Sequence, residues 1–394
     1  MLLARKRPER LVPEYSLTGD LLSFRRCARQ YRYQNGSSLP PSRPVQLWYG
    51  EFIHGVLENA YRLWESSGGT LSFPLPYLRI TTSDAIGEPP PGLSPHDVRN
   101  LGWPVEQALL HQNKRARSRA ARSAAYRRAE ATLNMLGPYL FPLIAQAEER
   151  VLGSRAVPHA VAEQFRAERY ALHGVIDVLT EIELTGAATD NLIRRAVQEQ
   201  CPELTGEFEV IVDYKGSRRP RVDSSEWQDG AWQVQTYAWL RHQQRRSRRV
   251  AAGILIYINE LAPGDADIGM IRTDMNLGRT DVEPSRDSDR RMLENWRQGS
   301  RADLSADFRF ARAIRVIPID DDSIAEATGA FDETVADIER RVKLEAEAVS
   351  ILQTWDDDCE DRKTCAACDF RYFCPGYLRN GNPAGSEDHI EDEI

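Results

Sequence analysis

The segment from about residue 160 to 259 constrains the fold most, because its apolar pattern sets an order of strands and helices. The stretches VAEQFRAERY and LHGVIDVLTEIEL alternate or run apolar as the two strands of a hairpin do, and EFEVIVDYKG has the pattern of a third strand. WQVQTYAWLRHQQRR is helical, and VAAGILIYIN, rich in β-branched and apolar residues, is typical of a buried strand. The order β-β-β-α-β predicts an α/β protein with a small mixed sheet.

Helical patterns flank this segment on both sides. Apolar side chains recur at helical spacing in residues 17–35 and 47–65, the Pro-rich stretch 74–104 indicates a loop, and helices dominate again to about residue 150. The pattern of charged and apolar residues in 321–352 predicts a long amphipathic helix. Because 41% of the 394 residues are hydrophobic, the chain can bury one large core or two ordinary ones. We therefore expect a small sheet embedded in helical flanks.

These changes of pattern divide the chain into six expected segments. They are N-terminal helices (1–66), a helical insertion with a basic helix (67–155), the α/β core (156–260), a second insertion with the long helix (261–352), a cysteine-bearing segment (353–380) and an acidic, disordered tail (381–394).

The cysteines indicate metal ligation rather than disulfides. MLLARKRPER lacks the apolar region of a signal peptide, and no run of about 18 apolar residues could span a bilayer, so we expect a cytoplasmic protein without a membrane partner. Cytosolic thiols stay reduced, and four of the six cysteines lie between residues 359 and 374.

The charge distribution leaves local nucleic-acid contacts open. A net charge of −8 argues against a wholly basic coat for nucleic acid, but net charge says little about patches. Residues 114–128 carry seven basic side chains and no acid, and residues 241–249 form a second Arg-rich run. Either run could contact phosphates or form a solvated face, and only a neighbouring site would favour contact.

Two charged residues of the third strand share one face of the sheet. Side chains two residues apart on a strand point the same way, so Asp213 and Lys215 lie together while Tyr214 points away. Asp177, on the neighbouring predicted strand, would add a second carboxylate if the strands pair. Two carboxylates suit Mg²⁺ or Mn²⁺, and the lysine suits a phosphate oxygen or an attacking water. The alternative is a surface salt bridge.

Four separated motifs, in a fixed order, resemble a RecB-type nuclease of the PD-(D/E)XK superfamily. They are GEFIHGVLE with His54, GVIDVL with Asp177, IVDYKG with Asp213 and Lys215, and QVQTY with Gln233 and Tyr237, which matches the QxxxY motif of that family. The resemblance implies a restriction-endonuclease-like core.

The resemblance also implies roles for these residues. It assigns a divalent metal, Mg²⁺ or Mn²⁺, to His54, Asp177, Asp213 and the carbonyl of Tyr214. Lys215 would orient or activate water, and Gln233 and Tyr237, one helical turn apart, would position the nucleic-acid strand or the lysine. The implied reaction is hydrolysis of a DNA phosphodiester.

One subset of this family carries a [4Fe-4S] cluster on one cysteine near the N-terminus and three near the C-terminus. Cys27 in LLSFRRCARQYRY, together with Cys365, Cys368 and Cys374, matches that set, so the cluster would join the two ends of the chain. A four-cysteine zinc site is the alternative. Cys359 could substitute as a ligand or stay free, whereas Cys201 has no expected role.

The resemblance extends to the iron-sulfur nucleases of CRISPR adaptation modules and to the nuclease domains of recombination helicase-nucleases. It implies an exonuclease on single-stranded DNA or DNA ends, in DNA repair, recombination or phage and CRISPR defence. No GxxxxGK[ST] motif occurs, so any unwinding needs a separate helicase or defence-complex subunit. The alternatives are a DNA-binding or scaffolding subunit that has lost catalysis and a zinc-stabilised protein without nuclease activity.

Overall fold

The computed structural model describes residues 12–34, 45–79, 88–183, 190–359, 365 and 368–379, so the expected acidic tail lies outside the described residues. The strands are β1 (Glu14–Ser16), β2 (Ile144–Ala156), β3 (Arg169–Glu183), β4 (Glu207–Lys215), β5 (Val250–Tyr257) and β6 (Ile314–Pro318). The longer helices are α3 (Val45–Ser66), α4 (Val98–His111), α5 (Arg119–Leu140), α6 (Leu192–Gln200), α7 (Ser225–His242), α9 (Asp265–Asn276), α10 (Asp287–Asn295), α11 (Ala306–Ala313) and α12 (Asp321–Ala348). The short helical elements are η1 (Leu17–Leu22), α1 (Ser23–Arg26), α2 (Ala28–Gln34), η2 (Phe141–Leu143), η3 (His159–Gln164), α8 (Ile258–Leu261), α13 (Ile351–Thr354), η4 (Arg371–Phe373) and α15 (Pro375–Arg379).

The six strands form one mixed sheet in the order β1-β3-β4-β5-β6, with β2 paired to β3. β4 and β5 are parallel and connected through α7, whereas β2 with β3, β3 with β4 and β5 with β6 are antiparallel. Every residue of β5 is buried, as its continuous apolar run predicts for a central strand. The expected mixed α/β fold is therefore confirmed.

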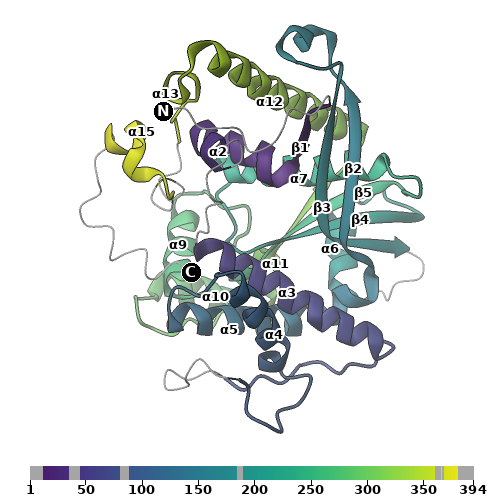
Figure 1. The fold of residues 1–394 in the computed structure, drawn as a ribbon. Coiled ribbons are helices and arrows are strands. Elements are labelled where there is room, and N and C mark those ends of the chain that lie inside the picture. Colours follow the sequence, from purple (N-terminus) through teal and green to yellow (C-terminus); the bar gives the residue numbers. More distant parts are fainter. Residues whose placement is uncertain are drawn as a thin grey trace.

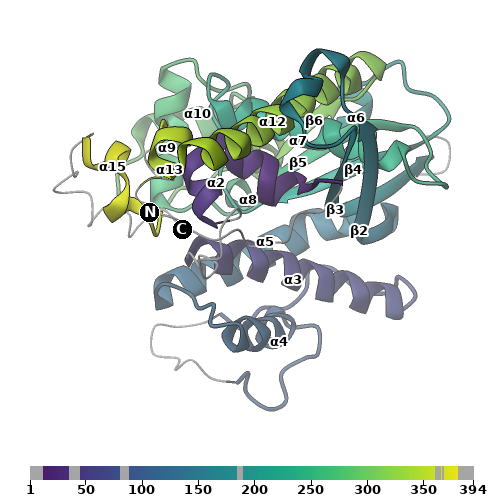
Figure 2. The ribbon, with the colours of Figure 1, turned by 45° about the horizontal axis from the view of Figure 1, so that its top comes forward.

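Helices cover both faces of the sheet and give a three-layer arrangement (Figure 1; Figure 2). On one face, α3, α4 and α5 pack against a core that includes Phe52, Tyr126 and Val212. On the other face, α7 and α12 share a core with the sheet that includes Val234 and Phe331. The helices α9, α10 and α11 have a small apolar cluster of their own, and within the described residues no helix is long and apolar enough to cross a membrane.

The sheet divides along β3. The second half of β3 pairs with β4, from Val178 opposite Val212 onward, whereas its first half pairs with β1 through Ala171–His173. Asp177 is the residue immediately before the β4 pairing begins. The sequence thus places a carboxylate where β3 and β4 separate, and where backbone groups and side chains of both strands can reach one ligand.

The structure corrects part of the expected topology. Residues 161–170 are not one strand, because η3 covers residues 161–164 and β3 begins only at Arg169. The hairpin partner of β3 is β2, in a region expected to be helical. β2 therefore belongs to the sheet although it lies within the expected insertion 67–155, and β1 and β6 also join the sheet from outside residues 156–260. The expected segments do not separate the core from its additions.

The two ends of the described chain are packed together. Arg29 donates hydrogen bonds to the carbonyls of Trp355 (2.9 Å) and Leu352 (3.1 Å) and to the carboxylate of Asp357 (2.6 Å). Arg32 forms two hydrogen bonds of 2.7 Å with Glu345 on α12. Both arginine side chains are buried, so these contacts fix α2 beside the C-terminal segment.

Candidate active site

Asp213 and Lys215 lie together at the end of β4, as the strand alternation predicts. Lys215 Nζ is 2.7 Å from Asp213 Oδ2, and Gln233 of α7 donates from Nε2 to Asp213 Oδ1 at 2.9 Å. Lys215 also donates to Gln233 Oε1. The Asp213 side chain is 6% exposed and that of Lys215 is 25% exposed. The Asp213 carboxylate and the Gln233 amide therefore hold the Lys215 ammonium in place while part of it stays open to solvent.

Tyr237 lies one turn after Gln233 and packs on β3. A Cβ at Gly174 would lie 2.6 Å from Cε1 of Tyr237, so this approach of the ring requires glycine. Burial, followed by the charges of Asp213 and Asp177, raises the pKa of Tyr237, which keeps its hydroxyl protonated. Gln233 and Tyr237 thus border the two carboxylates from the α7 side.

His54 of α3 and Asp177 of β3 approach the same place from the other face. His54 Nδ1 is 3.6 Å from Asp177 Oδ1, and His54 Nε2 is 3.2 Å from the carbonyl oxygen of Tyr214. A neutral imidazole that donates from Nε2 to this carbonyl presents the Nδ1 lone pair toward Asp177, which is the form in which histidine binds metals. The Tyr214 carbonyl, expected to be a metal ligand, is here a partner of His54.

The electrostatics of Asp177 are those of a buried acid among other acids. Its Oδ2 accepts a hydrogen bond of 2.8 Å from the backbone N–H of Tyr214. Burial, with the charges of Asp213 and Glu148, raises the pKa of Asp177 to about 7, although His54 and the Tyr214 N–H oppose this shift. A cation placed here would relieve the cost of this buried charge.

Glu148 on β2 is a residue that the sequence reasoning missed. Donor atoms of His54, Glu148 and Asp177 all lie within 4.8 Å of one another, the spacing of a candidate metal site. Asp213 is not a member of this group and is engaged with Lys215 and Gln233 instead. Oxygen donors with one imidazole suit Mn²⁺, and carboxylates suit Mg²⁺, so the donor set fits either ion. Nothing in the sequence singled out Glu148, because β2 lies in a region expected to be helical.

A cavity of about 560 Å³ opens beside Lys215 and Gln233. Its wall combines residues of η1, α1, the β4–α7 connection and α9. Five basic side chains and three acidic ones line it: Arg26, Lys215, Arg218, Arg221 and Arg279, with Glu226, Asp229 and Asp274. The excess of basic groups beside the lysine suits an anionic ligand.

Some side chains of the two basic runs make internal contacts, whereas Arg115, Arg117, Arg119, Arg127, Arg245, Arg246, Arg248 and Arg249 are exposed. Arg122 and Arg128 are buried and pair with Glu106 and Asp267, each with a shortest contact of 2.6 to 2.7 Å. Arg241 is buried against Glu209 on β4, at 2.7 Å. The run 241–249 precedes β5 and so lies at the opposite end of the sheet from the active-site residues.

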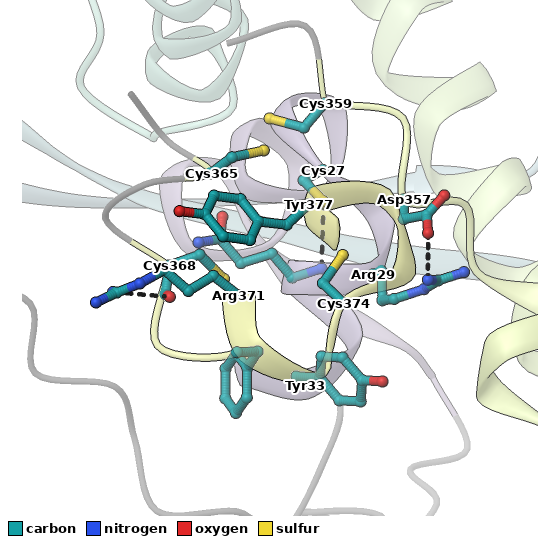
Figure 3. A pocket seen from close by; sticks show the side chains of 12 residues that line it. Cys27, Arg29, Tyr33, Asp357, Cys359, Cys365, Cys368, Arg371, Cys374 and Tyr377 are labelled. Carbon is teal, nitrogen blue, oxygen red and sulfur yellow. Dashed lines mark hydrogen bonds and ion pairs between the residues drawn. The ribbon is translucent and has the colours of Figure 1, made fainter. Parts of the chain in front are cut away.

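Five cysteines from the two ends of the chain line one pocket. Cys27, which ends α1, meets Cys359, Cys365, Cys368 and Cys374 there, and Figure 3 shows their side chains gathered around the same space. The rings of Tyr33 and Phe370 pack nearby, with centroids 5.0 Å apart and planes tilted by 37°. Cys201 lies elsewhere, beside the core that includes α3 and α5. The donor set fits a metal or cluster that prefers thiolates.

The surroundings of Cys27 favour the thiolate. A hydrogen bond from the Cys359 thiol lowers the pKa of Cys27 to about 7 against the effect of burial, and the Gln30 N–H, 3.5 Å from the Cys27 sulfur, contributes. Burial raises the pKa of Cys368 to about 11. Cys359 is thus a direct neighbour of an expected ligand, which the sequence had left undecided.

Two carboxylates and a lysine lie on strands of a mixed sheet at the point where the strands separate, and an imidazole is close by. This is the arrangement of metal-dependent phosphodiester hydrolases. The family model of the PD-(D/E)XK nuclease superfamily matches residues 19–375. The chain therefore belongs to the PD-(D/E)XK nuclease superfamily, whose nucleases use divalent metals such as Mg²⁺ or Mn²⁺.

Two further comparisons add little to this assignment. A solved structure titled "Crystal structure of SSO0001" is similar at 11% sequence identity and a TM-score of 0.25, covering 84% of this chain and 96% of its own. A likeness at this level says nothing further about the fold or function. No curated protein matches the sequence significantly.

Proposed function

We propose that this chain is a deoxyribonuclease that degrades single-stranded DNA or DNA ends as a metal-dependent exonuclease. The observation that carries the proposal is the meeting of two groups where β3 and β4 separate: Asp213 with Lys215 and Gln233 on one side, and Asp177 with His54 on the other. This placement supports catalytic roles for the residues that the four sequence motifs singled out.

Each side chain has a task that follows from its position. His54, Asp177 and Asp213 would hold the metal, which when bound would supply Lewis-acid stabilisation of charge on the phosphate and a more acidic water. Lys215, held by Asp213 and Gln233 at the edge of the cavity, directs a fixed positive charge at a phosphate oxygen or an attacking water. Gln233 fixes the positions of the Lys215 and Asp213 side chains relative to each other through its two hydrogen bonds. Tyr237 packs on β3 near Asp177.

The cavity supports a single-stranded substrate. Its volume of about 560 Å³ accommodates unpaired nucleotides, not a duplex, and its basic residues lie beside Lys215. A strand whose phosphates follow these side chains would place one phosphodiester against the lysine. Duplex ends would then be substrates only where they fray or after another subunit has unwound them.

The cysteine pocket supports a [4Fe-4S] cluster on Cys27, Cys365, Cys368 and Cys374. These thiols converge from both chain ends, and the acidified Cys27 is prepared for ligation. Cys359 lies beside them as a fifth thiol. A zinc site on the same residues is the competing assignment, and iron content with visible absorbance distinguishes the two.

The test of nuclease activity uses Asp213→Ala and Lys215→Ala with Lys343→Ala as the matched control, because Lys343 is exposed on α12. Linear and circular single-stranded DNA are incubated with Mn²⁺ or Mg²⁺ and with EDTA. We expect the wild type and the control to degrade only the linear strand and only with metal, and both site variants to lose cleavage while keeping their fold and DNA binding. Full activity of either site variant would refute the assignment, and cleavage of the circle would refute exonuclease action.

A second candidate function is a scaffolding subunit that binds DNA without cutting it, in a helicase-nuclease or defence complex. The same assay separates it, because a wild-type protein that binds the strand but leaves it intact under all metal conditions fits only this alternative. DNA repair, recombination and phage or CRISPR defence all remain compatible pathways for a nuclease of this kind.

A further inference from the structure

Glu148 occupies an irregular position directly beside Asp177. In the pairing of β2 with β3, Ala147 is opposite Val178 and Glu149 is opposite Ile176. Glu148 and Asp177 are the residues left between these two pairs. The register is the same on both sides of this position, so Glu148 lies directly opposite Asp177, although the two residues are not among the paired ones.

The backbone at Glu148 is strained. Its φ is +54°, a left-handed conformation that is energetically unfavourable for a residue other than glycine. Among the described residues, Asn113 and Val349 share this feature, but Val349 ends α12 and Asn113 follows α4, where such turns are ordinary. Glu148 lies within strand β2, where the chain does not turn and no left-handed conformation is required.

The strained conformation has a consequence for the side chain. It brings the Glu148 carboxylate within 4.8 Å of donor atoms of both His54 and Asp177. Arg62, whose charge acts on Glu148, is engaged with Glu58 on α3. Two carboxylates and one imidazole therefore lie close together, an arrangement whose negative charge a divalent cation would neutralise.

We propose that Glu148 is a ligand of the catalytic metal, together with His54 and Asp177, and that the left-handed conformation of Glu148 exists to place it there. The inference rests on the proposed function, because it adds a residue to the metal site of that reaction. Two carboxylates and an imidazole select a hard or borderline divalent ion, Mn²⁺ or Mg²⁺, over metals that prefer thiolates.

The test measures Mn²⁺ binding to the full chain in the absence of DNA, by titration calorimetry and by the shift in melting temperature. Glu148→Gln keeps the size of the side chain and removes its charge, and Glu149→Gln is the matched control on the same strand. We expect Glu148→Gln to weaken Mn²⁺ binding at least about tenfold and Glu149→Gln to leave it unchanged. Asp177→Ala serves as the reference for loss of the site.

Glu148→Gly separates a ligand from a structural residue. Glycine adopts a φ of +54° without strain, so this variant should melt at or above the wild-type temperature in EDTA and yet bind Mn²⁺ as weakly as Glu148→Gln. Wild-type affinity in Glu148→Gln and Glu148→Gly, with affinity lost in Asp177→Ala, would overturn the role of Glu148 and leave the proposed function standing. Wild-type affinity in Asp177→Ala as well would overturn the metal site itself.

Discussion

Replacing Asp177 by asparagine should stabilise the metal-free protein while destroying its response to metal. The Asp177 side chain is 14% exposed, and burial raises its pKa from 3.8 to about 7. Asparagine keeps an oxygen that can accept the hydrogen bond from the Tyr214 N–H but carries no charge. The substitution therefore removes the cost of burying a carboxylate without leaving that N–H unsatisfied.

The sign and size of the stability difference between Asp177→Asn and the wild type follow from proton linkage. Between pH 4 and pH 7 the unfolded chain has released the Asp177 proton and the native protein still holds it, so the stability of the wild type falls as the pH rises. The full difference is about 4 kcal/mol and is complete above pH 7. For a chain of this length it corresponds to a melting temperature higher by roughly 5 °C in Asp177→Asn at pH 8, with little difference near pH 4.

The assay is thermal unfolding in EDTA from pH 4 to pH 8.5, with Asp303→Asn, at an exposed position, as the control. Addition of Mn²⁺ at pH 8 should reverse the order, because only the wild type gains from binding. A constant difference between Asp177→Asn and the wild type across this pH range would refute the buried-acid reasoning. An equal rise of both proteins with Mn²⁺ would refute the place of Asp177 in the metal site.

Two further predictions concern the cysteine pocket and a buried ion pair. Cys27→Ser should lose iron and visible absorbance and melt at a lower temperature, whereas Cys201→Ser should keep its iron, absorbance and melting temperature. A Cys27→Ser protein with full iron content would indicate that Cys359 completes the site. Arg312→Leu should lower the free energy of unfolding by about 3–5 kcal/mol in chemical denaturation, because it leaves the Glu260 carboxylate, which is 1% exposed, without its guanidinium partner. Arg286→Leu, which breaks an exposed pair, should lower it by less than about 1 kcal/mol. Similar losses in the two variants would contradict this burial argument.

The sequence predicted the centre of the fold because local pattern and tertiary role agree there. The apolar run of β5 is buried along its whole length, and the alternation in β4 placed Asp213 and Lys215 on one face as observed. The order β4-α7-β5 was likewise predicted. In each case the residues that form the element also carry the signal for it.

The rest of the sheet depended on contacts that no local pattern contains. β2 pairs with β3 alone, and most of its residues are exposed or half-buried, so its Ala, Gln and Glu content favoured a helix. No local pattern marks the left-handed conformation of Glu148, which lies opposite Asp177 in the hairpin. The basic character of Arg128 could not disclose that its partner lies 139 residues away.

The contact between α2 and the C-terminal segment sets a schedule for biosynthesis. Arg29 leaves the ribosome 326 residues before Trp355, the residue whose carbonyl it binds. At about 5–20 residues per second, this interval is roughly 15 to 65 seconds. Cys27 therefore cannot meet its partners in the cysteine pocket until residues 359–374 have been translated. A chain truncated before Leu352 would lack the carbonyl and carboxylate partners of Arg29, so α2 would have no C-terminal segment to pack against.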